Sequence, residues 1–155
     1  MRFLLAFLIS IVAFPLLLAA PQAAAPASDD YSGMYSFLKD GEFIQITIEE
    51  KGVVSGFISR YGDSPSDKGS FLDQFFKSGN TDGKKLTFTT ESIHGVWFTF
   101  EGTFQRGSGK KPDDDGYFVV RGTLTRFSTD DQKKTASQVR QVEFKSFPRD
   151  TWPPR

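Results

Sequence analysis

The amino-acid sequence predicts an all-β domain in which seven or eight antiparallel strands run up and down and close into a small barrel. Apolar and polar residues alternate with period two in several short segments, and turn-forming residues separate these segments. The chain also contains 17 Phe, a bulky aromatic residue that favours strands and fills the interior of sandwiches and barrels. These observations together indicate one β-rich core.

The first three expected strands are joined by tight turns and form a meander. They cover residues 31–38, 43–50 and 53–60. Gly41 and Gly52 lie in the turns between them, where glycine accepts the positive φ that such turns need. In the second strand Ile44, Ile46 and Ile48 point to one face and polar residues to the other, which predicts that the isoleucine face is buried.

The segment 61–83 interrupts this rhythm and begins with a loop rich in Gly, Ser, Asp and Pro. Around residues 70–77, four apolar side chains have the spacing of one face of a short helix that Ser70 would cap. They are Phe71, Leu72, Phe75 and Phe76. The sequence favours this helix, and an extra strand is the alternative, which would raise the strand count from seven to eight.

Further strands are predicted at residues 84–90, 96–104, 116–128 and 136–147. With the three isoleucines, the residues expected in the core are Phe98, Phe100, Val120 and Leu124. The prolines after residue 147 cannot extend a β ladder, so we expect residues 148–155 to form a loose, Pro-rich tail.

The start of the chain has the features of an export signal. Arg2 precedes an uncharged apolar run over residues 3–20, and small residues follow as far as Ala27. We therefore expect a signal peptide over residues 1–27 and a mature protein that is secreted or periplasmic. An uncleaved membrane anchor is the alternative, which Pro15 and the small residues disfavour.

Cleavage after the leader leaves one β-barrel domain over residues 28–147. The chain has no Cys, so the domain must be stabilised by burial of apolar surface instead of disulfides. The full chain has a formal net charge of 0, and loss of Arg2 with the leader leaves the rest at −1, which gives no general attraction to nucleic acid or anionic lipid. We expect no nucleic-acid partner and no membrane association after cleavage, and the sequence leaves the oligomeric state open.

One pattern occurs three times at uneven intervals: an apolar residue, Gly, an apolar residue and Arg share one face of a strand. The glycines are Gly56, Gly102 and Gly122, and the arginines are Arg60, Arg106 and Arg126. Glycine inside a strand costs stability, and a reason for it is a sheet that coils sharply to close a barrel. The alternative is coincidence in a chain rich in Gly and Phe.

The segments Val54-Ser55-Gly56-Phe57-Ile58 and Phe100-Glu101-Gly102-Thr103-Phe104 are similar to the strands with a central Gly in avidin-like barrels. The layout of residues 31–147 resembles that family and the wider calycins, which implies a small barrel with a ligand cavity. Avidin-type biotin sites use several tryptophans. Here Tyr35 stands where the first-strand Trp falls, and Trp97 is the one Trp inside the domain. The resemblance therefore implies no biotin-binding residue, and Tyr35 and Trp97 are kept as candidate ligand contacts.

The three repeated arginines are the most informative charges, because strand parity places each on an apolar face. An inward Arg at a barrel mouth can hold a carboxylate or phosphate, and the alternative is an Arg that extends to water. If residues 70–77 form a helix, Arg60 and Arg106 lie at the same mouth. If residues 70–77 form a strand, Arg60 and Arg126 lie at the same mouth instead. The candidate ligand-binding residues are thus Arg60, Arg106, Arg126, Tyr35 and Trp97.

Catalytic and metal chemistry find little support in the sequence. His94 is the one histidine, which excludes zinc sites built from Cys or several His, and we expect it in a hairpin turn with a solvated ring. Asp113-Asp114-Asp115 is expected to be a solvated loop instead of a calcium site. Four glutamates are available for carboxylate catalysis, with surface solubility as their default role: Glu42, Glu49, Glu91 and Glu101. We predict no catalytic residue, no metal and no cofactor.

Three functions are compatible with these features. Non-catalytic binding of a small molecule or peptide is favoured by the aromatic content and the central glycines. A structural or protein-interaction domain with a filled core is the alternative, since eight-stranded barrels are narrow enough for side chains to fill. A hydrolase that uses carboxylates is disfavoured. An interior cavity would distinguish the first function from the second.

Overall fold

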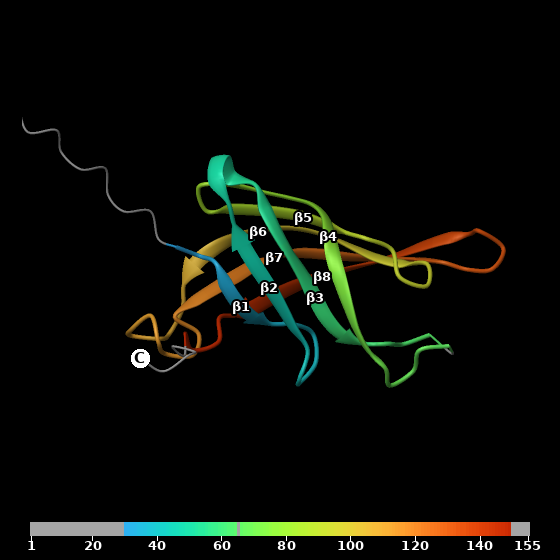
Figure 1. Ribbon diagram of the computed structural model, residues 1–155, viewed down its shortest axis with the longest axis horizontal. Helices are drawn as coiled ribbons and strands as arrows, with labels where there is room; N and C mark the ends of the chain where they lie inside the picture. The colour runs from blue at the N-terminus through green and yellow to red at the C-terminus, as the bar shows by residue number, and fades with distance from the viewer. Residues whose placement is uncertain (1–29, 65, 150–155) are drawn as a thin grey trace, which may run out of the picture.

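The computed structural model describes residues 30–64 and 66–149 and confirms the all-β, up-and-down prediction. Its strands are β1 (Gly33–Ser36), β2 (Phe43–Ile48), β3 (Val54–Tyr61), β4 (Phe71–Asp82), β5 (Lys85–Thr90), β6 (Val96–Arg106), β7 (Phe118–Thr129) and β8 (Thr135–Lys145). A short 3₁₀ turn, η1 (Glu50–Gly52), precedes β3. Each strand pairs antiparallel with the next, so sheet order follows chain order (Figure 1). The predicted signal peptide and residues 150–155 of the predicted tail lie outside the described residues.

The sheet curls until its first and last strands meet along a short seam. Tyr35 and Ser146 form a bridge there, and the Phe147 amide donates to the Met34 carbonyl at 2.9 Å. Because β1 is much shorter than β8, the seam lies at the C-terminal end of β8 and the two residues after it. The rest of β8 runs beyond the barrel with β7 as a projecting hairpin (Figure 1), and its residues from Thr135 to Gln141 are exposed. The barrel is therefore joined at one end and splayed at the other.

The segment around residues 70–77 is a strand, so the helix that the sequence favoured is wrong. In β4 the side chains of Phe71 and Phe75 point outward, and Leu72, Gln74 and Phe76 point inward. Apolar residues on both faces hide the period of two and match helical spacing equally well. Pairing with β3 decides the outcome, and the strand count is the even eight of the alternative.

The barrel interior is filled by large apolar side chains. Six of the seven residues predicted for the core are buried, and Ile48 is only partly buried. A ladder of phenylalanine rings crosses the interior, with successive centroids 4.5–5.7 Å apart. Its members in order are Phe76, Phe88, Phe100, Phe144, Phe37 and Phe98. Such contacts add to the stabilisation from burial and leave the middle of the barrel occupied by the protein itself.

The repeated glycines lie where a side chain would collide with the fold, and Gly102 makes room for one of these rings. Gly102 and Gly122 are direct partners across β6 and β7. A Cβ on Gly102 would overlap the Phe100 ring and the Arg121 carbonyl, so no other residue fits there without displacement. The predicted need for glycine at sharply curved strands therefore coincides with a packing need.

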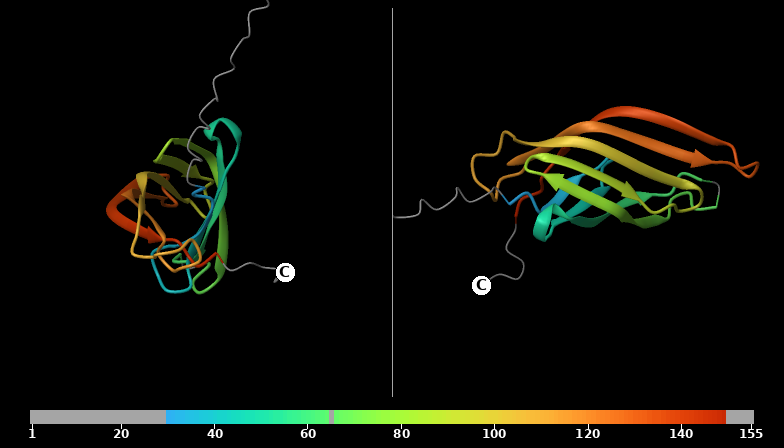
Figure 2. Two further views of the ribbon diagram at one scale, coloured as in Figure 1. Left: turned by 90° about the vertical axis from the view of Figure 1, so that its left-hand side faces the viewer. Right: turned by 90° about the horizontal axis from the view of Figure 1, so that it is seen from above.

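Because the strands run up and down, the loops between them lie alternately at the two ends of the barrel. Those that follow β1, β3, β5 and β7 gather at one end, and those that follow β2, β4 and β6 gather at the other (Figure 2). None of the described segments is a helix with the length and apolar character needed to cross a membrane.

Candidate functional site

Two of the predicted arginines share one end of the barrel. Arg60 in β3 and Arg126 in β7 both have inward parity, and both reach the carboxylate of Asp63 in the loop after β3. Asp63 Oδ2 lies 2.9 Å from Arg126 Nη2, and its Oδ1 lies 3.5 Å from Arg60 Nη1. This pairing follows from the strand assignment of β4, as the alternative in the sequence predicted. We call Arg60, Asp63, Gln74 and Arg126 the Arg60 mouth.

Arg60 is buried and hydrogen-bonded through Nε and Nη1 but not, within the described part of the chain, through Nη2. Its side chain is 4% exposed, its Nε donates to Gln74 Oε1 at 3.0 Å, and its Nη1 donates to the Tyr61 carbonyl at 3.2 Å. The guanidinium also lies 5.4 Å from the centroid of the Phe98 ring. Its Nη2 is buried and has no hydrogen-bond acceptor among the described residues. A buried donor of a charged group without an acceptor is costly, so this atom marks a place where an acceptor is stabilising.

Asp63 and Gln74 are the members of the Arg60 mouth that the sequence did not indicate, and Gln74 links the mouth to a neighbouring turn. Its Nε2 donates to the carbonyls of Glu91 and Val96, at 2.6 and 2.7 Å, and so ties β4 to the turn between β5 and β6. The side chain is fully buried. A polar residue at an inward strand position would have indicated this role, but its parity is defined only once β4 is known to be a strand.

A second polar cluster joins the same loop to the turn between β5 and β6. Asp67 Oδ2 is 2.7 Å from His94 Nδ1, and Oδ1 accepts hydrogen bonds from the amide and hydroxyl of Ser64. The hydrogen bond with His94 and those from Ser64 lower the pKa of Asp67 to about 2. His94 lies in a turn, as expected, but its half-exposed ring is bound. Ser64 donates to the carboxylate and not to the imidazole, so this arrangement does not activate the serine as a nucleophile.

The other three predicted site residues lie elsewhere. Arg106 sits at the opposite end of the barrel, with its guanidinium 3.3 Å from the centroid of the Tyr117 ring. Tyr35 is buried in β1 and donates to the Tyr31 carbonyl at 2.6 Å; burial raises the pKa of its hydroxyl. Trp97 lies on the outer face of β6 and stacks on Phe127 at 5.0 Å. The five candidates therefore do not converge, and only Arg60 and Arg126 come together.

Two of the acidic residues considered for catalysis or metal binding, Glu42 and Asp114, accept hydrogen bonds that stabilise loops. The buried carboxylate of Glu42 accepts hydrogen bonds from the amides of Lys39 and Tyr61, both at 3.1 Å. Asp114 Oδ2 accepts from the amides of Lys110 and Lys111, which closes that loop on itself. Over residues 30–64 and 66–149, no three or more His, Cys, Asp or Glu side chains are grouped in a way that could hold a metal ion.

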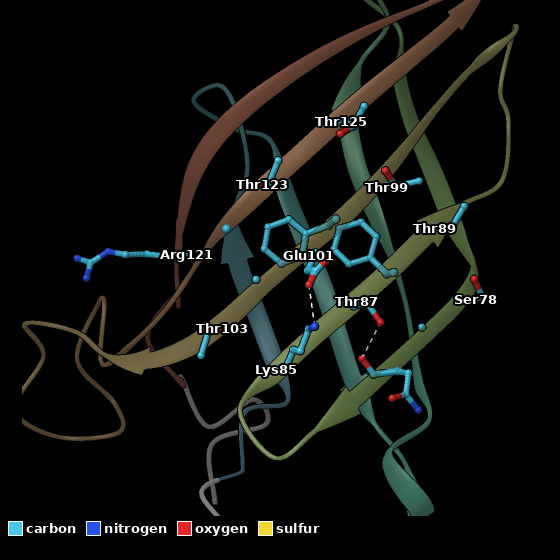
Figure 3. A pocket seen from close by; sticks show the side chains of 16 residues that line it. Ser78, Lys85, Thr87, Thr89, Thr99, Glu101, Thr103, Arg121, Thr123 and Thr125 are labelled. Atoms are coloured by element: carbon cyan, nitrogen blue, oxygen red, sulfur yellow. Dashed lines mark hydrogen bonds and ion pairs between the residues drawn. The ribbon is translucent and has the colours of Figure 1, made fainter.

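The outer face of β4–β7 carries a polar hollow of about 830 Å³ (Figure 3). Outward threonines from β5, β6 and β7 line it, namely Thr87, Thr89, Thr99, Thr103, Thr123 and Thr125. Lys85 and Glu101 form an ion pair of 2.7 Å within it. Their hydrogen bond lowers the pKa of Glu101 and raises that of Lys85. The hollow offers hydroxyl groups for hydrogen bonding, but its one ion pair is already satisfied.

A smaller hollow of about 360 Å³ lies beside the seam between β1 and β8. Tyr35, Phe118 and Ser146 line it together with Arg149. Arg149 donates to the carbonyls of Asp30 and Ser32, and so its charge is engaged by the segment that leads into β1. Among the predicted site residues, Tyr35 alone reaches this hollow.

Comparison with known proteins places the fold. No family model matches the chain, and no curated protein matches it. The rhizavidin–biotin complex is similar, with a TM-score of 0.55, 13% identity and coverage of 74% of this chain and 98% of that chain. Rhizavidin is similar with a TM-score of 0.57 and 13% identity, over 77% of this chain and 84% of that chain. Apo short afifavidin is similar with a TM-score of 0.51 and 16% identity, over 78% of this chain and 96% of that chain. The fold is avidin-like, as the resemblance in the sequence implied.

Proposed function

We propose that this protein is a non-catalytic binding barrel that receives an acidic small molecule or the acidic end of a peptide at the Arg60 mouth. The observation that carries the proposal is the buried Arg60 Nη2, which has no acceptor among the described residues. A carboxylate or phosphate oxygen supplies such an acceptor through a charge-assisted hydrogen bond. The rhizavidin–biotin complex is an example of a small molecule bound by a barrel of similar fold, and it supports this class of function.

Asp63 has a defined part in this proposal. Its carboxylate lies between two guanidinium groups, yet its side chain is 40% exposed and its contact with Arg60 is long for a hydrogen bond. A ligand carboxylate that takes its place keeps the charge balance of the mouth and brings its own second oxygen to Arg60. Asp63 therefore acts as an internal competitor that occupies the anion position until a ligand arrives.

A domain with a filled core that binds through its surface is the second candidate. The phenylalanine ladder favours it, because the rings occupy the depth of the barrel where a deeply buried ligand would lie. Under the first proposal the ligand is consequently held at the mouth, above Phe98.

Export completes the proposed function. Arg2, the apolar run over residues 3–20 and the small residues up to Ala27 support a cleaved leader. Sequencing the N-terminus of protein from its own host should find a start near Ser28, outside the cytoplasm. Recovery of an intact Met1 in a membrane fraction would contradict this.

Thermal unfolding in the presence of carboxylates and phosphate esters tests ligand binding at the mouth. A ligand that binds only the folded state raises the melting temperature according to its concentration relative to its Kd. We expect a rise with at least one such anion for the wild type and for Arg106→Lys, the matched variant at the opposite end. Arg60→Lys, which keeps the charge but loses the forked donor, should lose the rise. An equal rise in both variants would contradict the proposal.

A further inference from the structure

The outer face of β2, β3 and β4 carries a group of aromatic rings that the Arg60 mouth does not use. These strands lie side by side on one side of the barrel (Figure 1). Neighbouring rings are in contact, at centroid distances of 5.1–6.3 Å. The rings belong to Phe75, Phe57, Phe43, Phe71 and Tyr61, in order of contact, and we call them the aromatic arc. Phe75 is 59% exposed, and Phe71 and Tyr61 are also exposed, so the arc is open to a partner.

The arc surrounds one hydroxyl and one carboxylate. In the strand register, Phe57 is opposite Phe75, Tyr61 is opposite Phe71, and Ser59 between them is opposite Asp73. Ser59 faces outward yet is only 1% exposed, and it lies between Phe57 and Tyr61 on β3 and opposite Phe43 on β2. Its hydroxyl donates to Asp73 Oδ1, which fixes the carboxylate in place. Asp73 itself is exposed, so an anchored anion sits in an aromatic frame.

Asp73 has no cationic partner among the described residues. The ion pairs within the described residues all involve acids other than Asp73, including Glu101 with Lys85, Glu143 with Arg121 and Asp63 with Arg126. Aromatic faces attract cations, a carboxylate binds them by charge-assisted hydrogen bonds, and the methylene stem of Lys or Arg packs on apolar surface. The frame and the carboxylate therefore complement the same kind of group, a cation on an apolar stem.

We propose that the aromatic arc and Asp73 form a docking site for a Lys or Arg side chain of a partner polypeptide. Charge complementarity favours this occupant over a second copy of the chain, since an isologous contact through this face brings two Asp73 carboxylates together. Charge complementarity also favours a Lys or Arg side chain over a membrane surface, because an exposed carboxylate at the centre of the arc repels anionic lipid. The site lies on the outer face, so it does not depend on ligand binding at the Arg60 mouth.

Titration of the isotope-labelled protein with blocked tripeptides, followed by NMR, tests the site. The probes are Ac-Leu-Arg-Leu-NH₂ and its neutral isostere with citrulline in place of Arg. We expect the Arg peptide to shift the amide signals of residues 57–61 and 71–75, and to bind about fivefold more tightly than the citrulline peptide. Asp73→Asn should make the two peptides equal, and Phe75→Ser should weaken both.

Asp131→Asn, which removes an exposed acid from the turn between β7 and β8, is the matched control and should leave the preference for Arg unchanged. Equal binding of the two peptides by the wild type, or a preference for Arg that survives Asp73→Asn, would overturn the proposal. So would self-association or binding to phosphatidylcholine vesicles that Phe75→Ser abolishes, because either result assigns the arc to another occupant.

Discussion

Arg60 and Gln74 are joined inside the barrel by a hydrogen bond of 3.0 Å between Nε and Oε1, and both side chains are buried. Gln74 is neutral, so it orients the guanidinium without cancelling its charge. The balancing carboxylate, Asp63, lies at the rim and is shared with Arg126. A cation with a fixed orientation and an incomplete set of acceptors is thus built into one end of the fold.

The first prediction concerns this pair. Gln74→Leu removes the acceptor of Arg60 Nε and both donors to the carbonyls of Glu91 and Val96. We expect a loss of about 2–5 kcal/mol in the free energy of unfolding, measured with urea, because several buried polar groups lose their partners. The exposed Gln132→Leu is the control and should change it by less than about 0.5 kcal/mol. Similar stability of the two variants would mean that the network does not stabilise the fold.

The second prediction concerns the isoleucine face of β2. Ile46 is fully buried, so Ile46→Ala should lower the free energy of unfolding by about 2–5 kcal/mol. Thr47→Ala alters the adjacent exposed residue and should cost less than about 0.5 kcal/mol. Reversed costs in a denaturant titration would show that the strand presents its other face to the core.

The third prediction follows from the pairing of Asp67 with His94. The folded-state pKa of Asp67 is about 2, below the ordinary value of about 3.9. The stability that this carboxylate contributes is therefore present above about pH 4 and is lost as the pH falls towards 2. The difference in free energy of unfolding between wild type and Asp67→Asn should shrink over this range. A difference that stays constant with pH would contradict the pairing.

The fourth prediction concerns Tyr35. Burial raises the pKa of its hydroxyl, so the group should stay protonated in the folded barrel well above the ordinary value of about 10. In an ultraviolet titration of tyrosinate, we expect the Tyr35 step to occur late, together with unfolding. Tyr35→Phe should remove that step. A titration of Tyr35→Phe that retains the late step would assign it to another residue.

The fold could be predicted from the sequence wherever one face of a strand is apolar and the other polar. The alternation of Ile44 and Ile46 with polar neighbours carries that pattern plainly. β4 does not: Phe71 and Phe75 point outward while Leu72 and Phe76 point inward, so the local pattern is as helical as it is extended. Pairing with β3 decides the structure, and that pairing lies outside the local pattern of residues 70–77.

The same limit applies to the Arg60 mouth. Parity predicted that Arg60 and Arg126 point inward, because each follows apolar residues on its strand. Asp63 and Gln74 could not be assigned, since Asp63 lies in an irregular loop and Gln74 lies in a segment whose sequence pattern favours a helix. Predicting a contact between Asp63 and Arg126 requires knowing that the loop after β3 meets the end of β7.

Native mass spectrometry of the protein purified from its own host tests the central claim most directly. The wild type and Arg106→Lys should retain one small acidic molecule per chain under gentle conditions and release it on unfolding. Arg60→Lys, checked to be folded, should carry none. A wild-type protein found only at its own mass, or an Arg60→Lys variant that retains the same molecule, would contradict a ligand site at the Arg60 mouth.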